Sequence, residues 1–195
     1  MSVKDSLYIF KKNYSELKKL LEYYSNLEKS LLQVASKPGA DILLMLEATR
    51  LLHNFIASAL SLRDCTRWVY KDICKSQKLL QEYQTKVDST FTNNDLAKFI
   101  EDIRIYCQHY KTPIVYSQLL YSKDPPIFER NMKLDIKALE KFKNWNPQSK
   151  QFISKHTDGI NLLELVHQYY DLVIEFHDWF RRQYMNIITN KESDY

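Results

Sequence analysis

Arg104 and His109, within the stretch FIEDIRIYCQHYKTPIV (residues 99–115), are the side chains of this 195-residue chain best suited to acid–base chemistry on a phosphate ester. A guanidinium offers permanently charged, bidentate hydrogen bonds to phosphate oxygens. An imidazole, with an ordinary pKa near 6.5, can donate or accept a proton at neutral pH. Lys111 adds positive charge and Tyr110 an aromatic ring, so both are expected to bind the substrate. Together these residue types suit cleavage of a phosphodiester without a metal ion.

The spacing of Arg104 and His109 separates them by about 140° around a helix axis and about 7.5 Å along it. They therefore do not share one narrow face, although the long arginine side chain can bend round and a helix end before Pro113 can depart from ideal geometry. The negative end of the helix dipole would favour a charged imidazolium at His109. In the alternative interpretation, Arg104 pairs with Asp102 or Glu101 at the surface and His109 merely ends the helix.

A second polar cluster lies in EATRLLHN, where spacings of three and four residues place the side chains on adjoining faces of an otherwise apolar helix. Its members are Glu47, Arg50, His53 and Asn54. If the cluster is buried, its polar groups must find partners, and it would then be a network that fixes helix register. In a functional interpretation, it orients the helix that carries Arg104 or forms part of a cleft wall.

Metal-binding patterns are incomplete in this chain. Glu164 and His167 have the E-x-x-H spacing of carboxylate-bridged di-iron bundles, but such sites need two copies and the sequence holds one. Cys65, Cys74 and Cys107 are widely spaced and form no zinc-type cluster. We therefore expect neither a metal nor another cofactor.

The composition favours a helical globular domain. The chain is 45% hydrophobic and 27% charged, and its two glycines are too few for a Gly-rich phosphate loop or for an all-β fold full of tight turns. The net charge of +4 permits an anionic partner such as RNA without requiring one, because lysines on solvated helix faces give the same sum.

Apolar residues at helical spacing predict a first helix over residues 4–35, a second over 41–86, and a third from a cap at Asn93 or Asn94 to about residue 111. The first and second are separated by the breaker KPGAD.

Strand-like and turn-like residues follow the third helix. Residues 113–136 predict a small β-hairpin with a moderately long loop. Asp135 can cap a short helix that runs through Phe142. Asn146 before Pro147 predicts the start of another helix. A last long helix covers residues 160–188. The predicted fold is mainly α, a helical bundle of three long helices plus short helices, with a small β-hairpin after the third helix.

The sequence predicts one domain over residues 1–188 and a C-terminal tail over residues 189–195. The N-terminal stretch MSVKDSLYIFKKNYSELKK is charged and lacks an uninterrupted apolar segment, so no signal peptide or membrane anchor is expected. The three cysteines are an odd number and are widely spaced, so they are expected to be reduced thiols. The expected lack of a signal peptide and the reduced thiols together predict a cytoplasmic protein.

The helix sequence ATRLLHNFIASALSLRDCTRWV, followed by FIEDIRIYCQHYKTPIV and then a hairpin-like segment, resembles the HEPN superfamily of small helical proteins, best over residues 41–115. In that family an arginine and a histidine separated by four to six residues form the site, and homodimers bring two such motifs together. The resemblance implies that Arg104 and His109 are catalytic. It further implies a homodimeric, metal-independent endoribonuclease of a toxin–antitoxin or antiviral system, with RNA as substrate and a cognate antitoxin or other protein as partner.

One position departs from the family pattern. The residue after the arginine is commonly polar, often asparagine, and here it is Ile105. This departure favours the alternative function, a non-catalytic helical interaction or scaffold module with a degenerate HEPN site.

Overall fold

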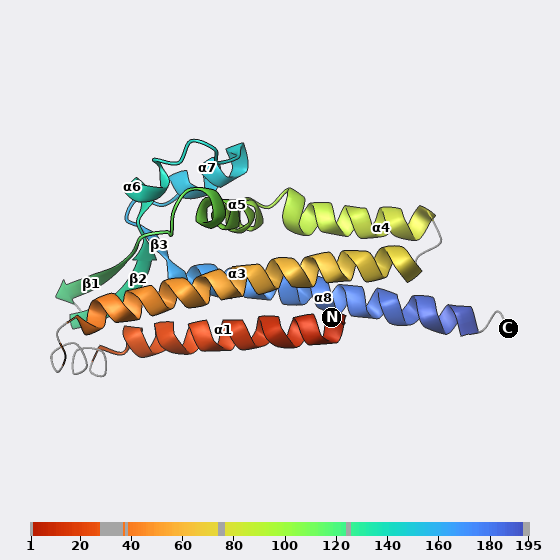
Figure 1. Cartoon of the computed structure of the whole chain (residues 1–195), viewed down its shortest axis with the longest axis horizontal. Coiled ribbons are helices and arrows are strands. Elements are labelled where there is room, and N and C mark those ends of the chain that lie inside the picture. The colour runs from red at the N-terminus through yellow and green to blue at the C-terminus, as the bar shows by residue number, and fades with distance from the viewer. Residues whose placement is uncertain (1, 28–36, 38, 74–76, 124–125, 193–195) are drawn as a thin grey trace.

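Three long helices lie side by side and form the body of the protein in the computed structural model, which describes residues 2–27, 37, 39–73, 77–123 and 126–192 (Figure 1). These helices are α1 (Val3–Ser25), α3 (Ala40–Ile73) and α8 (Leu162–Glu192). In Figure 1, α3 and α8 run in the same direction and α1 runs opposite to both. The described part of the chain is mainly helical, which confirms the predicted fold class.

Helix α1 begins at a capping box formed by Ser2 and Asp5. The Ser2 hydroxyl accepts a hydrogen bond from the Asp5 amide at 3.1 Å, and the Asp5 carboxylate accepts one from the Ser2 amide at 3.1 Å. The apolar face of α1 then packs into the core with Phe10, Leu17, Leu21 and Tyr24, which follow one another at helical spacing. The predicted first helix reached Ala35, but α1 ends at Ser25, and residues 28–36 lie outside the described part of the chain.

Helix α3 is the central element and contacts α1, α5, α8 and β1. Among the described residues, it is the helix long and apolar enough to cross a membrane by length and composition. The core helix of a soluble protein passes the same test, and 44% of the stretch in question is buried inside this fold. Its buried side includes Leu52, Phe55, Ala59 and Leu62.

The prediction of one helix over residues 41–86 is wrong. Helix α3 ends at Ile73, and α4 (Gln77–Val87) runs back alongside it (Figure 1). The rings of Tyr70 and Tyr83 stack with centroids 4.4 Å apart, and the Tyr70 hydroxyl donates to the Leu79 carbonyl at 3.0 Å. Folding back therefore buries an aromatic surface that a continuous helix would leave in water. A π-helical turn, η1 (Asp88–Thr92), follows α4.

Helix α5 (Asp95–His109) carries the predicted catalytic pair. It begins where expected, because the Asn94 side chain accepts a hydrogen bond from the Ala97 amide at 3.1 Å. It packs against α3 and α7 (Pro147–Ser154), and it ends two residues before the predicted boundary at Lys111.

The predicted β-hairpin is confirmed as β1 (Val115–Lys123) paired antiparallel with β2 (Pro126–Leu134). A short β3 (Ile160–Asn161), not predicted, extends it to a sheet of order β1-β2-β3 at one end of the body (Figure 1). The pairing of Lys123 with Pro126 leaves two connecting residues, fewer than the moderately long loop that was expected. The sheet follows the fourth described α-helix and not the third, because the predicted second helix is in fact two helices, α3 and α4.

Two predicted helix caps lie after the sheet. The carboxylate of Asp135 accepts from the Ala138 amide at the start of α6 (Ile136–Leu139), which is shorter than predicted. The side chain of Asn146 accepts from the Ser149 amide at the start of α7. Helix α8 continues to Glu192, so residues 189–192 of the predicted tail are helical.

Candidate functional site

Arg104 and His109 lie on the exposed side of the last turns of α5. The opposite side of this helix is buried and includes Phe99, Ile100, Ile103 and Tyr106. Helical geometry places Arg104 and His109 on two flanks of the exposed side, about 140° apart, with the exposed residues Ile105 and Gln108 between them. Within one protomer, the structure therefore does not bring the two side chains onto one face.

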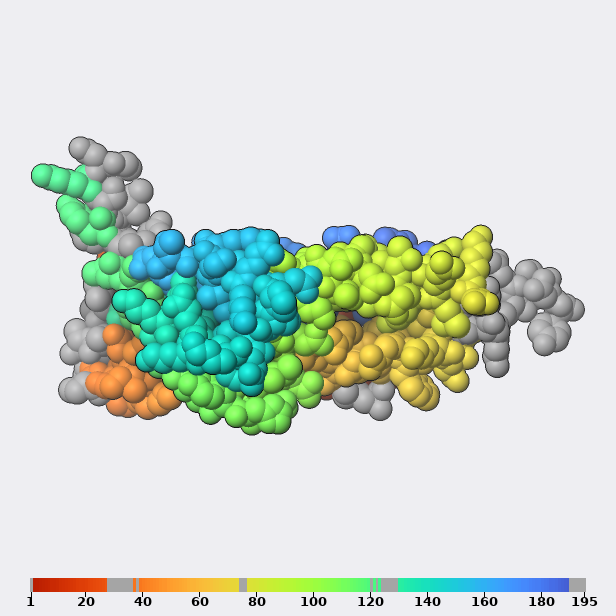
Figure 2. Space-filling view, turned by 90° about the horizontal axis from the view of Figure 1, so that it is seen from above, coloured from red at the N-terminus to blue at the C-terminus, as the bar shows by residue number. Residues whose placement is uncertain are grey.

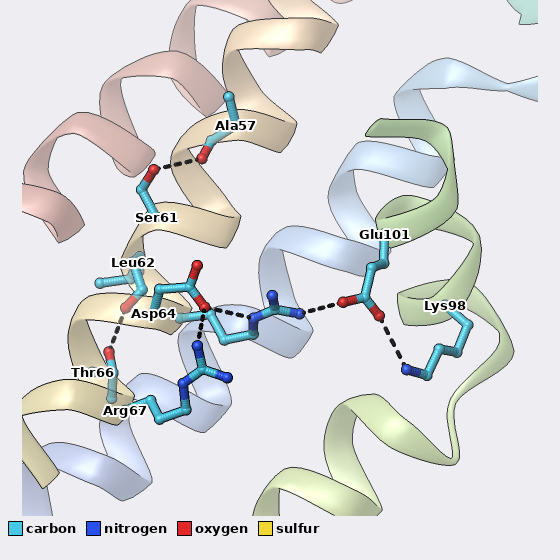
Figure 3. Close-up of polar contacts among 9 residues, drawn as sticks. Ala57, Ser61, Leu62, Asp64, Thr66, Arg67, Lys98 and Glu101 are labelled. Carbon is cyan, nitrogen blue, oxygen red and sulfur yellow. Dashed lines mark hydrogen bonds and ion pairs between the residues drawn. The ribbon is translucent and has the colours of Figure 1, made fainter. Parts of the chain in front are cut away.

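The carboxylate of Glu101, which the alternative interpretation assigned to Arg104, is engaged elsewhere. It accepts hydrogen bonds from Arg63 Nη1 at 2.9 Å and from Lys98 Nζ at 3.0 Å (Figure 3). Burial alone would raise the pKa of Glu101, but the hydrogen bonds from Arg63 and Lys98 outweigh it and hold this pKa below its ordinary value.

The other nearby carboxylate, Asp102, points into the protein. It is buried and accepts a hydrogen bond from the Asn146 amide at 2.9 Å, at the start of α7. Arg104 consequently has no ion-pair partner within the described part of the chain. Its exposed guanidinium is available to an anion from solution.

Tyr110 and Lys111 lie just beyond the end of α5, next to His109. The Tyr110 ring is 47% exposed and packs on Phe142 with centroids 5.3 Å apart, so one part of it is held and another part faces solvent. Lys111 Nζ lies 5.5 Å from the centre of that ring. This arrangement presents a cation and an aromatic surface beside the histidine.

The second polar cluster is a surface feature and not a buried network. Glu47 and Arg50 form an ion pair of 2.6 Å, and their side chains are 44% and 56% exposed. The hydrogen bond from Arg50 holds the pKa of Glu47 below its ordinary value. His53 is exposed, and Asn54 is half-buried.

A cleft of about 380 Å³ lies between this part of α3 and the end of α5. Its lining residues are Leu46, Thr49, Arg50, Leu52, His53, Asn54, Ile56, Cys107, Thr112 and Pro113. Three members of the predicted cluster therefore form a cleft wall, as the functional interpretation proposed, while Glu47 is not among the lining residues.

The thiol of Cys107 in this cleft is not a nucleophile at neutral pH, because burial raises its pKa to about 11. Arg104 precedes Cys107 by about one helical turn and is not among the residues that line this cleft.

Arg63 and Arg130 form ion pairs between elements, and the sequence did not single out either residue. Arg63 joins α3 to α5 through Glu101. Arg130, on β2, is 6% exposed and donates from Nη2 to both carboxylate oxygens of Asp41 at 2.7 Å. Nothing in the local pattern around either residue distinguishes it from an exposed charge.

His167 of the incomplete E-x-x-H motif shares a hydrogen bond of 2.6 Å between its Nδ1 and the Tyr14 hydroxyl. Within the described ranges, no group of three or more histidine, cysteine, aspartate or glutamate side chains could hold a metal ion.

No protein-family model, curated protein sequence or solved structure matches this chain.

Proposed function

We propose that this chain is a HEPN-like RNA-binding protein that cleaves RNA without a metal ion and acts as a homodimer. The observation that supports the proposal is the exposed guanidinium of Arg104, which has no ion-pair partner in the described part of the chain, on the same helix end as the exposed His109. The carboxylates of Glu101 and Asp102 are occupied by other partners. A guanidinium and an imidazole that face one phosphodiester suit its recognition and proton transfer to or from it.

In the proposed reaction, Arg104 binds the scissile phosphate and stabilises the charge that develops on it. His109 accepts the proton of the ribose 2'-hydroxyl as that oxygen attacks phosphorus, or donates a proton to the leaving 5'-oxygen. The P–O5' bond breaks as the O2'–P bond forms, which leaves a cyclic phosphate and a 5'-hydroxyl. Lys111 would bind a flanking phosphate, and Tyr110 would stack on a base.

Dimerisation belongs to the proposal because Arg104 and His109 occupy different flanks of α5. Since one protomer does not present both groups to one phosphate, a second copy related by a two-fold axis would supply the complementary group. The proposed setting is cytoplasmic, in a toxin–antitoxin or defence system, with an antitoxin or another protein as a further partner.

The test is incubation of the purified protein with mixed RNA in the presence of EDTA. Arg104→Ala and His109→Ala should each abolish cleavage, whereas Gln108→Ala, on the same exposed side of α5, should cleave as wild type does. Cleavage that survives both motif substitutions would come from a contaminating nuclease and would contradict the proposal.

A non-catalytic scaffold is the second candidate, and the position of Ile105 favours it. This side chain is 43% exposed and lies between the two flanks, where the resemblance implies a polar residue. RNA binding in a gel-shift assay without any cleavage, weakened by Arg104→Ala, would support this function over the nuclease.

A further inference from the structure

The exposed side of α3 carries a continuous seam, which we call the α3 face. Its residues recur every three or four positions, which is the spacing of residues at which one helix meets a second helix. They extend over about 42 Å along α3. They are Leu43, Leu46, Arg50, His53, Ala57, Ser61, Asp64, Trp68 and Lys71. The seam lies opposite the side of α3 that is buried in the protomer.

Large apolar side chains of the α3 face are more than half exposed. Leu43 and Leu46, near the start of α3, are 58% and 60% exposed, and their neighbour Ile42 is 61% exposed. Trp68, near the other end, is 69% exposed. Clustered exposed apolar groups of this kind mark interaction sites.

The charges along the α3 face are arranged symmetrically about Ala57. Glu47 and Arg50 form one surface pair, and Asp64 and Arg67 form another, with nitrogen–oxygen distances of 2.6 Å and 3.2 Å (Figure 3 shows the second). Glu47 and Arg67 lie equally far before and after Ala57, and so do Arg50 and Asp64. An antiparallel second copy centred on Ala57 therefore places Arg50 opposite the partner's Asp64.

The same register also matches the apolar groups. Trp68 comes to lie opposite the partner's Leu46, at the wall of the 380 Å³ cleft, so its indole can fill that cleft. The small residues Ala57 and Ser61 at the centre allow the two helices to approach closely. A parallel arrangement would instead set Arg50 against the partner's Arg50 and Asp64 against the partner's Asp64, which like-charge repulsion disfavours.

We infer that the α3 face is the interface for a second copy of this chain, with the two α3 helices antiparallel and a two-fold axis at Ala57. The inference rests on the α3 face and not on the proposed RNA chemistry. In Figure 2, the start of α3, the end of α5 and the last turns of α3 follow one another along one edge, so the end of α5 borders this interface.

Light scattering on the full chain tests the inference first. Wild type should have twice the 23.4 kDa mass of one chain at the upper end of a concentration series. A 23.4 kDa particle throughout the series would overturn the inference.

A charge exchange tests the register. Arg50→Glu and Asp64→Arg should each raise the dimer dissociation constant about tenfold or more, because each sets like charges against one another. The double variant Arg50→Glu/Asp64→Arg should restore the dimer, since the charges are exchanged and not removed. Circular dichroism would verify that each variant is folded. An unchanged dimer dissociation constant in both single variants would show that the dimer uses another surface and would overturn the inference.

Cysteine cross-linking tests the two-fold axis without depending on charge. Ala57→Cys should give a covalent dimer under mild oxidation, because the two new thiols meet on the axis. Lys71→Cys, on the same face, should stay uncrosslinked because it lies opposite the partner's Leu43. Wild type under the same oxidation measures the background of cross-linking through the native cysteines. Cross-linking at residue 71 as well as residue 57 would indicate parallel helices and would overturn the antiparallel register.

Discussion

Arg63 on α3 and Glu101 on α5 are joined by an ion pair of 2.9 Å that fixes the helix carrying Arg104 and His109 against the central helix (Figure 3). Burial alone would lower the pKa of Arg63, but the hydrogen bond to Glu101 outweighs it, and the guanidinium stays charged. Because Glu101 is committed to this pair and to Lys98, it leaves Arg104 free.

The first prediction concerns this helix–helix link. Glu101→Gln should lower the free energy of unfolding by about 1–2 kcal/mol, because it removes the closer of the two carboxylates that pair with the partly buried Arg63. Urea denaturation would measure the change. Glu22→Gln, which removes an exposed pair with Lys18 at 3.4 Å, is the matched control and should change stability by less than about 0.5 kcal/mol. Equal losses of stability in Glu101→Gln and Glu22→Gln would show that the ion pair between Arg63 and Glu101 adds no more than a surface pair.

The second prediction concerns Arg130, whose guanidinium also lies 4.4 Å from the centre of the Tyr24 ring. Arg130→Met should cost about 2–3 kcal/mol, since it breaks the contact between the sheet and the start of α3 and leaves Asp41 unpaired. Chemical denaturation would report it. Lys155→Met, which removes a surface partner of Asp95, should cost less than about 1 kcal/mol. A smaller loss for Arg130→Met than for the control would contradict this account.

The third prediction compares two glycines with positive φ. Gly159 has φ of +87°, and a Cβ there would collide with the Tyr116 hydroxyl and come within 3.0 Å of the Lys133 side chain. Gly39 has φ of +79°, but a Cβ there would meet nothing within 4 Å. Gly39→Ala should therefore cost only about 1–2 kcal/mol of backbone strain. Gly159→Ala should lower the midpoint of thermal unfolding by more than Gly39→Ala does. Equal shifts for the two variants would rule out the steric explanation.

The fourth prediction concerns the pH dependence of stability. Burial, helped by the positive charges of Lys11 and Arg181, lowers the pKa of His177 below its ordinary value of 6.5, against the opposing effect of Asp178. The unfolded chain then binds a proton that the folded chain does not, so stability is complete above pH 6.5 and falls as the pH drops below it.

Urea denaturation at about pH 7.5 and about pH 5.5 would measure this loss. His177→Gln should flatten the pH dependence over that interval. His53→Gln, at an exposed histidine, should retain it because His177 is intact. An unchanged slope in His177→Gln would assign the dependence to other groups.

The fifth prediction rests on the proposed function. Lys111→Gln should weaken RNA binding and lower the slope of log affinity against log salt by about 0.7, the value for one lost phosphate contact on a single strand. Fluorescence anisotropy over a salt series would measure it. Lys19→Gln, an exposed lysine on α1, should leave the slope unchanged. Equal slopes for Lys111→Gln and wild type would remove Lys111 from the RNA contact.

Helix boundaries marked by caps were predictable because a cap is a local interaction. Asn94, Asp135 and Asn146 each accept a hydrogen bond from an amide three residues later, so the sequence around each one contains the whole interaction. The reversal between α3 and α4 was not predictable in this way. It is stabilised by contacts of Tyr70 with Tyr83 and of both with α8, which the local helical periodicity does not encode.

By itself, the sequence determined the mainly α fold, the β-hairpin and the position of Arg104 and His109 at the end of a helix, because periodicity and capping act over a few neighbouring residues. Only the tertiary structure decided which charges of the site are free. Glu101 could have paired with Arg104 on its own helix, but the packing of α5 on α3 gives it Arg63. Ion-pair partners depend on which helix faces meet, and those contacts join residues far apart in the chain.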